Sequence, residues 1–369
     1  MCIIETNRLL LRPFKASDLD DFYDYAKVPG VGERAGWRHH RSKQESLEVL
    51  NHFIESSEVF AIVLKETSKL IGSIGLHPRD KNPKILDLGY VLSKDYWGKG
   101  LMSEAVLNIL DYAFNVLNLE ALTCGHFKEN KASQRIIRKA GFRFLKEGKY
   151  YSKNMNQEFD HLTYTLTKER FMFLKEDEIL KKLPNDELWQ LFPITLKDYN
   201  EAWVTWYEDM AKKIHNTLKD NILRISHIGS TAVKNLVAKP TIDILMEIDK
   251  KTNLDELKDS LIDLGFRYHY LPSSQEPYMM FTKGYTLKGY DERIYHLHIR
   301  YLGDWDELYF KDYLNDEEKV KVAYQNLKIE LAKMFKHDRD RYTNSKTDFI
   351  KEASRKARLK YGFIYNPKN

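Results

Sequence analysis

The stretch YVLSKDYWGKGLMSEA, residues 90–105, decides the fold of the N-terminal half of the chain. It predicts the end of a strand that begins near residue 85, a short loop carrying Gly98 and Gly100, and the first turn of a helix. The helix is supported by apolar residues at four-residue steps: Ala105, Ile109, Ala113 and Leu117. A helix that opens after glycines presents unpaired backbone N–H groups, lets a ligand come close and favours negative charge. The loop is therefore a candidate pyrophosphate site, although a tight turn that needs positive φ would have the same sequence.

Length and composition indicate a two-domain protein. A chain of 369 residues exceeds one ordinary hydrophobic core. Its 59 basic and 54 acidic residues give a net charge of only +5, so we expect no nucleic-acid partner. The two cysteines, Cys2 and Cys124, fit a reducing compartment, and no apolar run reaches membrane-spanning length. We expect a cytoplasmic protein without a membrane partner, and its oligomeric state stays undetermined.

The boundary between the two domains is predicted in a charged segment. Leu162, Tyr164 and Leu166 alternate with threonines, as in a closing strand. The charged residues that follow are interrupted by Pro184. We therefore predict a first domain over 1–168, a linker over 169–187 and a second domain over 188–369. Both are expected to be of the α/β (α+β) class, with mixed sheets and flanking helices.

Three motifs in the first half occur in a set order. They are ETNRLLLRP at 5–13, YWGKG at 96–100, and NKAS at 130–133 followed by Gly141. Together they resemble the Gcn5-related N-acetyltransferases, in particular the ribosomal-protein alanine acetyltransferase-like branch, over about residues 3–168. The resemblance implies an acetyl-CoA-dependent N-acetyltransferase that acts on a primary amine of a small molecule or a protein N-terminus.

The resemblance also implies which residues hold acetyl-CoA. Backbone groups near Val91 and Leu92 are expected to pair with the pantetheine arm where the strand leaves its neighbour. The pyrophosphate is expected on the backbone N–H groups of the loop and first helical turn: Gly98, Lys99, Gly100, Leu101 and Met102.

Asn130 and Ser133 have two interpretations each. The resemblance implies that Asn130 touches the pantetheine arm and that Ser133 is a catalytic residue that protonates the leaving thiolate. From the residues alone, Asn130 is an N-cap of a helix over 131–140, and Ser133 is a polar residue of its first turn. A base must also accept the amine proton. Asp87 and Glu104 are candidates, but each has a structural alternative, and we choose neither.

The second half contains a strand, a glycine turn and a strand bearing a carboxylate. The motifs are HIGSTAV at 227–233 and KPTIDI at 239–244. This layout is typical of nucleotidyltransferases, in which Gly229 and Ser230 would bind a nucleoside triphosphate and Asp243 would bind Mg²⁺ as a catalytic carboxylate. Residues 188–362 resemble the GrpB family, an uncharacterised group assigned to the nucleotidyltransferase fold.

The metal ligands of this second site are incomplete in the sequence. Metal-dependent nucleotidyl transfer needs two carboxylates two residues apart on one strand face, but Leu245 stands there. Glu247 shares the face of Asp243, yet four strand residues separate their Cα atoms by roughly 13 Å. His296 and His298 also share a face, and we predict His298 as a metal ligand beside Asp243. A site that binds nucleotide or metal without transferring anything is an equal alternative.

The sequence thus predicts an N-acetyltransferase fused to a GrpB-type, nucleotidyltransferase-like domain. One alternative is a bifunctional enzyme whose two halves modify one antibiotic. Another is an acetyltransferase regulated by an inactive, nucleotide-sensing second domain. The expected partner is a small-molecule or peptide amine.

Overall fold

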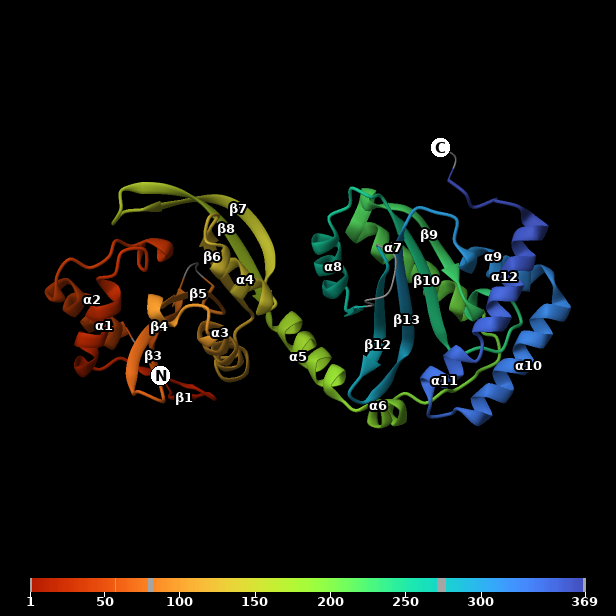
Figure 1. The fold of residues 1–369 in the computed structure, drawn as a ribbon, viewed down its shortest axis with the longest axis horizontal. Coiled ribbons are helices and arrows are strands. Elements are labelled where there is room, and N and C mark those ends of the chain that lie inside the picture. Colours follow the sequence, from red (N-terminus) through yellow and green to blue (C-terminus); the bar gives the residue numbers. More distant parts are fainter. Residues whose placement is uncertain (1, 57, 79–81, 271–276, 368–369) are drawn as a thin grey trace. The chain divides into compact units, whose positions relative to one another are not determined.

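The computed structural model describes residues 2–56, 58–78, 82–270 and 277–367. The chain divides into two compact units, Met1–Leu174 and Lys175–Asn369. Each unit consists of one mixed sheet with helices against it (Figure 1), which confirms the predicted fold class.

The first unit is built on eight strands in the order β1-β2-β3-β4-β5-β6-β8-β7. These are β1 (Ile4–Glu5), β2 (Leu9–Pro13), β3 (Val59–Leu64), β4 (Lys69–Pro78), β5 (Ile85–Leu92), β6 (Ala121–Phe127), β7 (Arg143–Ser152) and β8 (Gln157–Thr167). β5 and β6 pair in parallel, and every other neighbouring pair is antiparallel. The strand predicted before the glycine loop is therefore confirmed as β5.

Helices cover both faces of this sheet. α1 (Leu19–Ala26) and α2 (Lys43–Ser56) pack on one face through a cluster that includes Phe22 and Leu50. α3 (Leu101–Asp111) and α4 (Lys131–Lys139) pack on the other face. α3 passes into a single π-helical turn, Tyr112–Val116, which shifts the helical register. The predicted apolar stripe is therefore wrong at its last member, since Leu117 is exposed.

The segment predicted as a linker is helical over most of its length. It contains α5 (Lys168–Lys182) and α6 (Asn185–Leu191), with Pro184 at the N-cap of α6. Phe171 of α5 packs on Phe114 in the first unit, with ring centroids 4.9 Å apart. Leu180 belongs to a cluster with Phe192 in the second unit. The residues of this segment are thus shared between the two units.

The second unit has five strands in the order β11-β12-β13-β10-β9, with β10 and β13 parallel. These are β9 (Ile222–Ile228), β10 (Thr241–Ile248), β11 (Arg267–His269), β12 (Met279–Thr286) and β13 (Gly289–Tyr301). Its further helices are α7 (Ala202–Leu218), α8 (Leu254–Asp263), α9 (Asp306–Asp316), α10 (Glu318–Met334), α11 (Arg339–Asn344) and α12 (Thr347–Tyr361).

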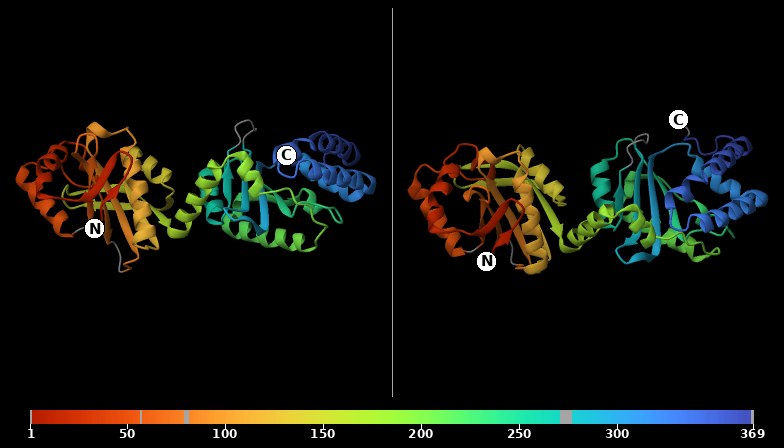
Figure 2. Two further views of the ribbon diagram at one scale, coloured as in Figure 1. Left: turned by 90° about the horizontal axis from the view of Figure 1, so that it is seen from below. Right: turned by 60° about the horizontal axis from the view of Figure 1, so that its bottom comes forward.

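The two faces of this second sheet differ in what covers them. The even-numbered residues of β10 are apolar and pack against α7 and α8. The opposite face bears Asp243 and meets the group formed by α9 to α12, which lie together in all views (Figures 1 and 2). α9 packs on this face through Leu308, which contacts Ile228 and Leu245. The rest of the face remains open as the floor of a large cavity.

Within the described ranges, no helix has both the length and the apolar character required to cross a bilayer.

Candidate functional sites

The glycine loop of the first unit leaves an open array of backbone donors. Gly98 and Gly100 have φ of +74° and +75°, and α3 begins directly after them. A Cβ on Gly98 would meet no atom within 4 Å, and one on Gly100 would meet only Arg8 at 3.7 Å. Among the described residues, no acceptor is found for the backbone N–H groups from Gly98 to Ser103. This is the geometry that the predicted pyrophosphate site requires.

An ion pair fixes this loop to the N-terminal motif. Glu104 Oε1 accepts hydrogen bonds from Thr6 Oγ1 at 2.6 Å and from the Arg8 backbone at 2.7 Å, and Oε2 accepts from Arg8 Nε at 2.7 Å. Arg8 Nη1 also donates to the Lys99 carbonyl at 3.0 Å. Burial opposes ionisation of Glu104, but these hydrogen bonds outweigh it and lower the pKa of its carboxyl. Glu104 is therefore engaged structurally and is not a free base.

The strand before the loop separates from its neighbour, as predicted. β5 pairs with β6 from Ile85 to Leu88 and no further. On the other side, Ser93 N donates to the Ile71 carbonyl, so by alternation the backbone groups of Tyr90 and Leu92 face the gap. The Leu92 carbonyl already accepts from Trp97 Nε1 at 2.8 Å. The Leu92 N–H thus remains the group of that residue that is open to a ligand.

Helix α4 supplies the other side of the gap. The Asn130 side chain accepts from Ser133 N at 3.2 Å, and Gly141 ends the helix with φ of +92°, so the predicted N-cap and stop are confirmed. The Tyr90 phenol donates to the Ser133 carbonyl at 3.4 Å. Burial raises the pKa of Tyr90, which keeps the phenol protonated. The sequence reasoning did not identify Tyr90 as part of the site.

A cavity of about 310 Å³ joins these features. Its lining contains eight of the nine predicted coenzyme-binding residues: Val91, Leu92, Gly98, Gly100, Leu101, Met102, Asn130 and Ser133. The Lys99 side chain is not in the lining and lies over the Tyr96 ring at 5.0 Å. Three cations that the sequence did not single out line the cavity as well, namely Arg34, Arg135 and Lys139. They make the cavity suited to an anionic ligand.

The other candidate base is also engaged. Asp87 accepts a hydrogen bond from Thr123 Oγ1 at 2.5 Å across the paired part of β5 and β6. It lies outside the cavity lining. Asp87, like Glu104, is therefore engaged structurally.

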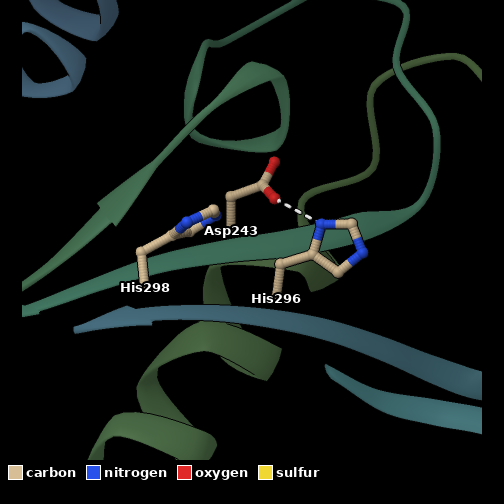
Figure 3. Close-up of side chains that lie close together, drawn as sticks. All are labelled: Asp243, His296 and His298. Carbon is tan, nitrogen blue, oxygen red and sulfur yellow. Dashed lines mark hydrogen bonds and ion pairs between the residues drawn. The ribbon is translucent and has the colours of Figure 1, made fainter. Parts of the chain in front are cut away.

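In the second unit, Asp243, His296 and His298 lie together on one sheet face (Figure 3). Asp243 and His298 are the predicted metal ligands, and His296 shares the face of His298. Asp243 of β10 lies opposite His296 of β13, and His298 is the next residue of β13 on the same face. His296 Nδ1 lies 3.1 Å from Asp243 Oδ1. One ligand atom from each of Asp243, His296 and His298 lies within 4.8 Å of the others.

The protonation of these groups follows from their burial. Burial lowers the pKa of His296 to about 4 and also lowers that of His298, although Asp243 opposes both shifts. Burial raises the pKa of Asp243, but the hydrogen bond from His296 and the nearby positive groups outweigh it and leave the pKa lowered. At neutral pH the site therefore has one carboxylate and two neutral imidazoles.

Glu247 does not belong to this site. It is fully buried and held by Arg224, whose Nη2 donates to Glu247 Oε1 at 2.7 Å, while Gly303 N donates to the same oxygen at 3.0 Å. The distance argument from the sequence is thus consistent with the structure. A second carboxylate from β10 is not available to a metal at Asp243.

The predicted Gly229-Ser230 turn lies directly against Asp243. Gly229 has φ of +70°, and a Cβ there would come within 2.4 Å of Asp243 Oδ2, so only glycine fits. Gly229, Ser230, Asp243 and His298 all line one cavity of about 1200 Å³. The structure therefore brings the predicted residues of the second domain together.

Cations surround the carboxylate in this cavity. Lys239, Arg339 and Lys346 line it, and among the described residues none of the three forms an ion pair within 4.0 Å. Lys239 Nζ and Lys346 Nζ both lie over the Tyr342 ring, 5.3 and 4.1 Å from its centroid. Burial lowers the pKa of Lys239 to about 7 and that of Lys346 to about 8. Lys239 belongs to the KPTIDI motif, but its grouping with Arg339 and Lys346 was not predicted, because the three residues come from separate segments of the chain.

Comparison with known proteins assigns each unit to a class. The acetyltransferase (GNAT) domain family matches residues 8–143, and the GrpB protein family matches residues 193–356. The chain thus contains an acetyltransferase domain of the GNAT class followed by a GrpB domain. The presence of the GNAT domain supports classification of the protein as an acyltransferase.

Three individual relatives each match less than half of the chain. The glutamate-rich protein GrpB of Alkalihalophilus pseudofirmus is 28% identical over 43% of this chain and 92% of its own length. The uncharacterized N-acetyltransferase YoaA of Bacillus subtilis is 26% identical over 46% of this chain and 98% of its own. A solved structure of the conserved protein GrpB from Enterococcus faecalis is 30% identical, covers 45% of this chain and 99% of its own, and has a TM-score of 0.41.

Proposed function

We propose that the first unit transfers an acetyl group from acetyl-CoA to a primary amine of a small molecule or a protein N-terminus. The observation that carries this proposal is the array of unpaired N–H groups from Gly98 to Ser103, which opens on a cavity lined by three cations. Such an array, at the start of a helix, suits a pyrophosphate. Acetyl-CoA would supply the acyl thioester there.

The remaining residues have roles that follow from their positions. The Leu92 N–H and the gap beyond Leu88 orient the acyl end, since an N–H aimed at a developing oxyanion stabilises it. Ser133, with the protonated Tyr90 phenol behind it, is placed to give a proton to the departing thiolate. Arg34, Arg135 and Lys139 attract the phosphates of the coenzyme.

The coenzyme site is tested with a matched pair of glycine variants. Gly98→Ala and Gly30→Ala both place a methyl group at positive φ with no atom within 4 Å, but Gly30 is outside the cavity lining. Each change should cost about 1–2 kcal/mol of stability. By calorimetry, Gly98→Ala should bind acetyl-CoA at least about tenfold more weakly, equivalent to 1.4 kcal/mol, and Gly30→Ala should bind normally. Equal affinities in the two variants would contradict the assignment.

For the second unit we infer a site for a phosphorylated ligand, with a nucleoside triphosphate as the predicted class. The specific observation is the cluster of Lys239, Arg339 and Lys346 around the single carboxylate of Asp243. Lys346→Met should weaken the binding of ATP, with and without Mg²⁺, whereas Lys333→Met, an exposed cation on α10, should not. Unchanged binding in Lys346→Met would contradict the inference. Turnover of bound ATP would support a transferase, and binding without turnover a sensor.

A further inference from the structure

The donor atoms of Asp243, His296 and His298 have the spacing of ligands to one ion. Two ligands that lie 2.0–2.2 Å from the same metal are about 3.0–3.5 Å apart. The 3.1 Å between His296 Nδ1 and Asp243 Oδ1 falls in this range. All three donor atoms are within 4.8 Å of one another, so a small movement of His298 completes the set.

We propose that these three residues form a transition-metal site with open coordination positions, rather than a magnesium site. Mg²⁺ prefers oxygen ligands throughout, whereas two imidazoles and one carboxylate are the ligands of Fe²⁺, Zn²⁺, Co²⁺ or Mn²⁺ sites. Three protein ligands leave room for water or a substrate atom. The cavity of about 1200 Å³ above the sheet face provides that access.

Each imidazole is oriented by a tyrosine at its other nitrogen. His296 Nε2 lies 2.8 Å from the Tyr285 hydroxyl, and His298 Nδ1 lies 3.3 Å from the Tyr278 hydroxyl. The ring of His298 points toward Asp243 in Figure 3. Outer partners of this kind fix the ring and the tautomer of metal-binding histidines.

Two hydrogen-bond arrangements fit the distances at His296. In one, Nε2 accepts from Arg339 Nη2 at 3.1 Å and Nδ1 donates its proton to Asp243. In the other, Nε2 carries the proton and donates to Tyr285, which also accepts from Arg339 at 2.8 Å. The second arrangement leaves a lone pair on Nδ1 beside the carboxylate, and a bound metal ion selects it.

The neighbouring cations determine what binds next to the metal. Lys239, Arg339 and Lys346 repel a bare metal ion, and an anion in the cavity offsets that repulsion. The ligand at the open metal positions is therefore expected to be a phosphate or another anionic group. The metal site itself rests on the geometry of its three ligands and does not depend on the proposed nucleotide.

The test uses Co²⁺, whose visible absorption reports its ligands. The full-length protein carries a Cys2→Ser change, because Cys2 is exposed and its thiol would also bind Co²⁺. This Cys2→Ser protein should bind one equivalent of Co²⁺, and the bound ion should absorb visible light. An excess of Mg²⁺ should not displace the Co²⁺. Asp243→Asn and His298→Asn should each weaken Co²⁺ binding by more than about tenfold.

His269→Asn is the matched control, since His269 lines the same cavity but bonds Thr282 Oγ1 at 2.7 Å instead. It should bind Co²⁺ as the parent protein does. Thermal melts exclude unfolding, and His298→Asn serves as the decisive variant where Asp243→Asn is unstable. The absence of Co²⁺ binding, or equal binding in His298→Asn and His269→Asn, would overturn the proposal, and a parent protein that prefers Mg²⁺ would do so too.

Discussion

The Glu104→Gln variant distinguishes a positioning role from a catalytic one at the loop proposed to bind acetyl-CoA. Glutamine keeps the shape and can still accept from Thr6 and from the Arg8 backbone. Its amide nitrogen, however, faces the Arg8 Nε donor that now lies 2.7 Å from Oε2. A hydrogen bond between charged groups contributes about 1.5–3 kcal/mol, and the 45% exposure of the Arg8 side chain lets water replace part of it. We therefore expect a loss of about 1–2 kcal/mol in unfolding free energy.

The same change should weaken acetyl-CoA binding moderately. Without Glu104, Arg8 is no longer held in place to donate to the Lys99 carbonyl, a hydrogen bond of about 0.5–1.5 kcal/mol. At 1.4 kcal/mol per tenfold, this corresponds to roughly 2- to 12-fold weaker binding. Calorimetric titration with acetyl-CoA measures the affinity. In a thermal melt, the transition that acetyl-CoA shifts is the unfolding of the first unit. Its midpoint temperature should be about 2–8 °C lower in Glu104→Gln than in the parent protein.

The pH dependence has a definite sign. Because the folded-state pKa of Glu104 is lowered, its contribution is present above the ordinary value of 4.5 and is lost as the pH falls through the folded-state value. The stability difference between the parent protein and Glu104→Gln should therefore shrink below pH 4.5. Glu5→Gln, which removes the exposed ion pair with Lys65, is the control and should change neither stability nor affinity.

One result would refute this reasoning. If Glu104 were the general base, Glu104→Gln would lower turnover by about 10²- to 10⁴-fold while acetyl-CoA affinity stayed unchanged. Turnover is followed as thiol release with an amine found active in a panel of small amines and peptides.

Two further predictions concern the unit boundary and the second cavity. A chain ending at Leu174 should fold and bind acetyl-CoA, whereas one ending at Arg170 should be less stable by about 3–5 kcal/mol because it lacks the buried Phe171; equal melting temperatures would contradict this. ATP should raise the lowered pKa values of Lys239 and Lys346, so binding at pH 8 should take up protons and weaken as the pH rises further. Calorimetry in two buffers of different ionisation enthalpy measures the uptake, and proton release on binding would contradict it.

Local features of the chain could be predicted from the sequence because they depend on near neighbours. β5 begins near residue 85 as predicted, and the glycines of the loop have the positive φ that only glycine adopts without strain. Asn130 caps α4, and Gly141 ends it. The shared face of His296 and His298 follows from the two-residue period of a strand. These features, with the motifs around them, determined both fold classes and most of the site proposed for the coenzyme.

The sequence could not assign partners that meet only through the fold. Glu104 and Arg8 are 96 residues apart in the sequence. Because the two side chains pair in the folded protein, Glu104 is no longer a candidate for the general base. The π-helical turn after α3 was not visible in the apolar periodicity and moved Leu117 to the surface. Tyr90 joined the site because the crossing of β5 and α4 placed its phenol beside Ser133.

The second cavity shows the same division. The sequence determined that Asp243 follows a glycine turn and that two histidines share a face. Only the tertiary structure decided that His296 joins Asp243 and His298 as a possible metal ligand, and that Glu247 is held by Arg224 instead. It also decided that cations from separate elements surround the carboxylate of Asp243. Strand period and glycine conformation are properties of a few consecutive residues. Charge compensation, burial and metal geometry are properties of groups that the folded sheet and helices bring within a few ångströms.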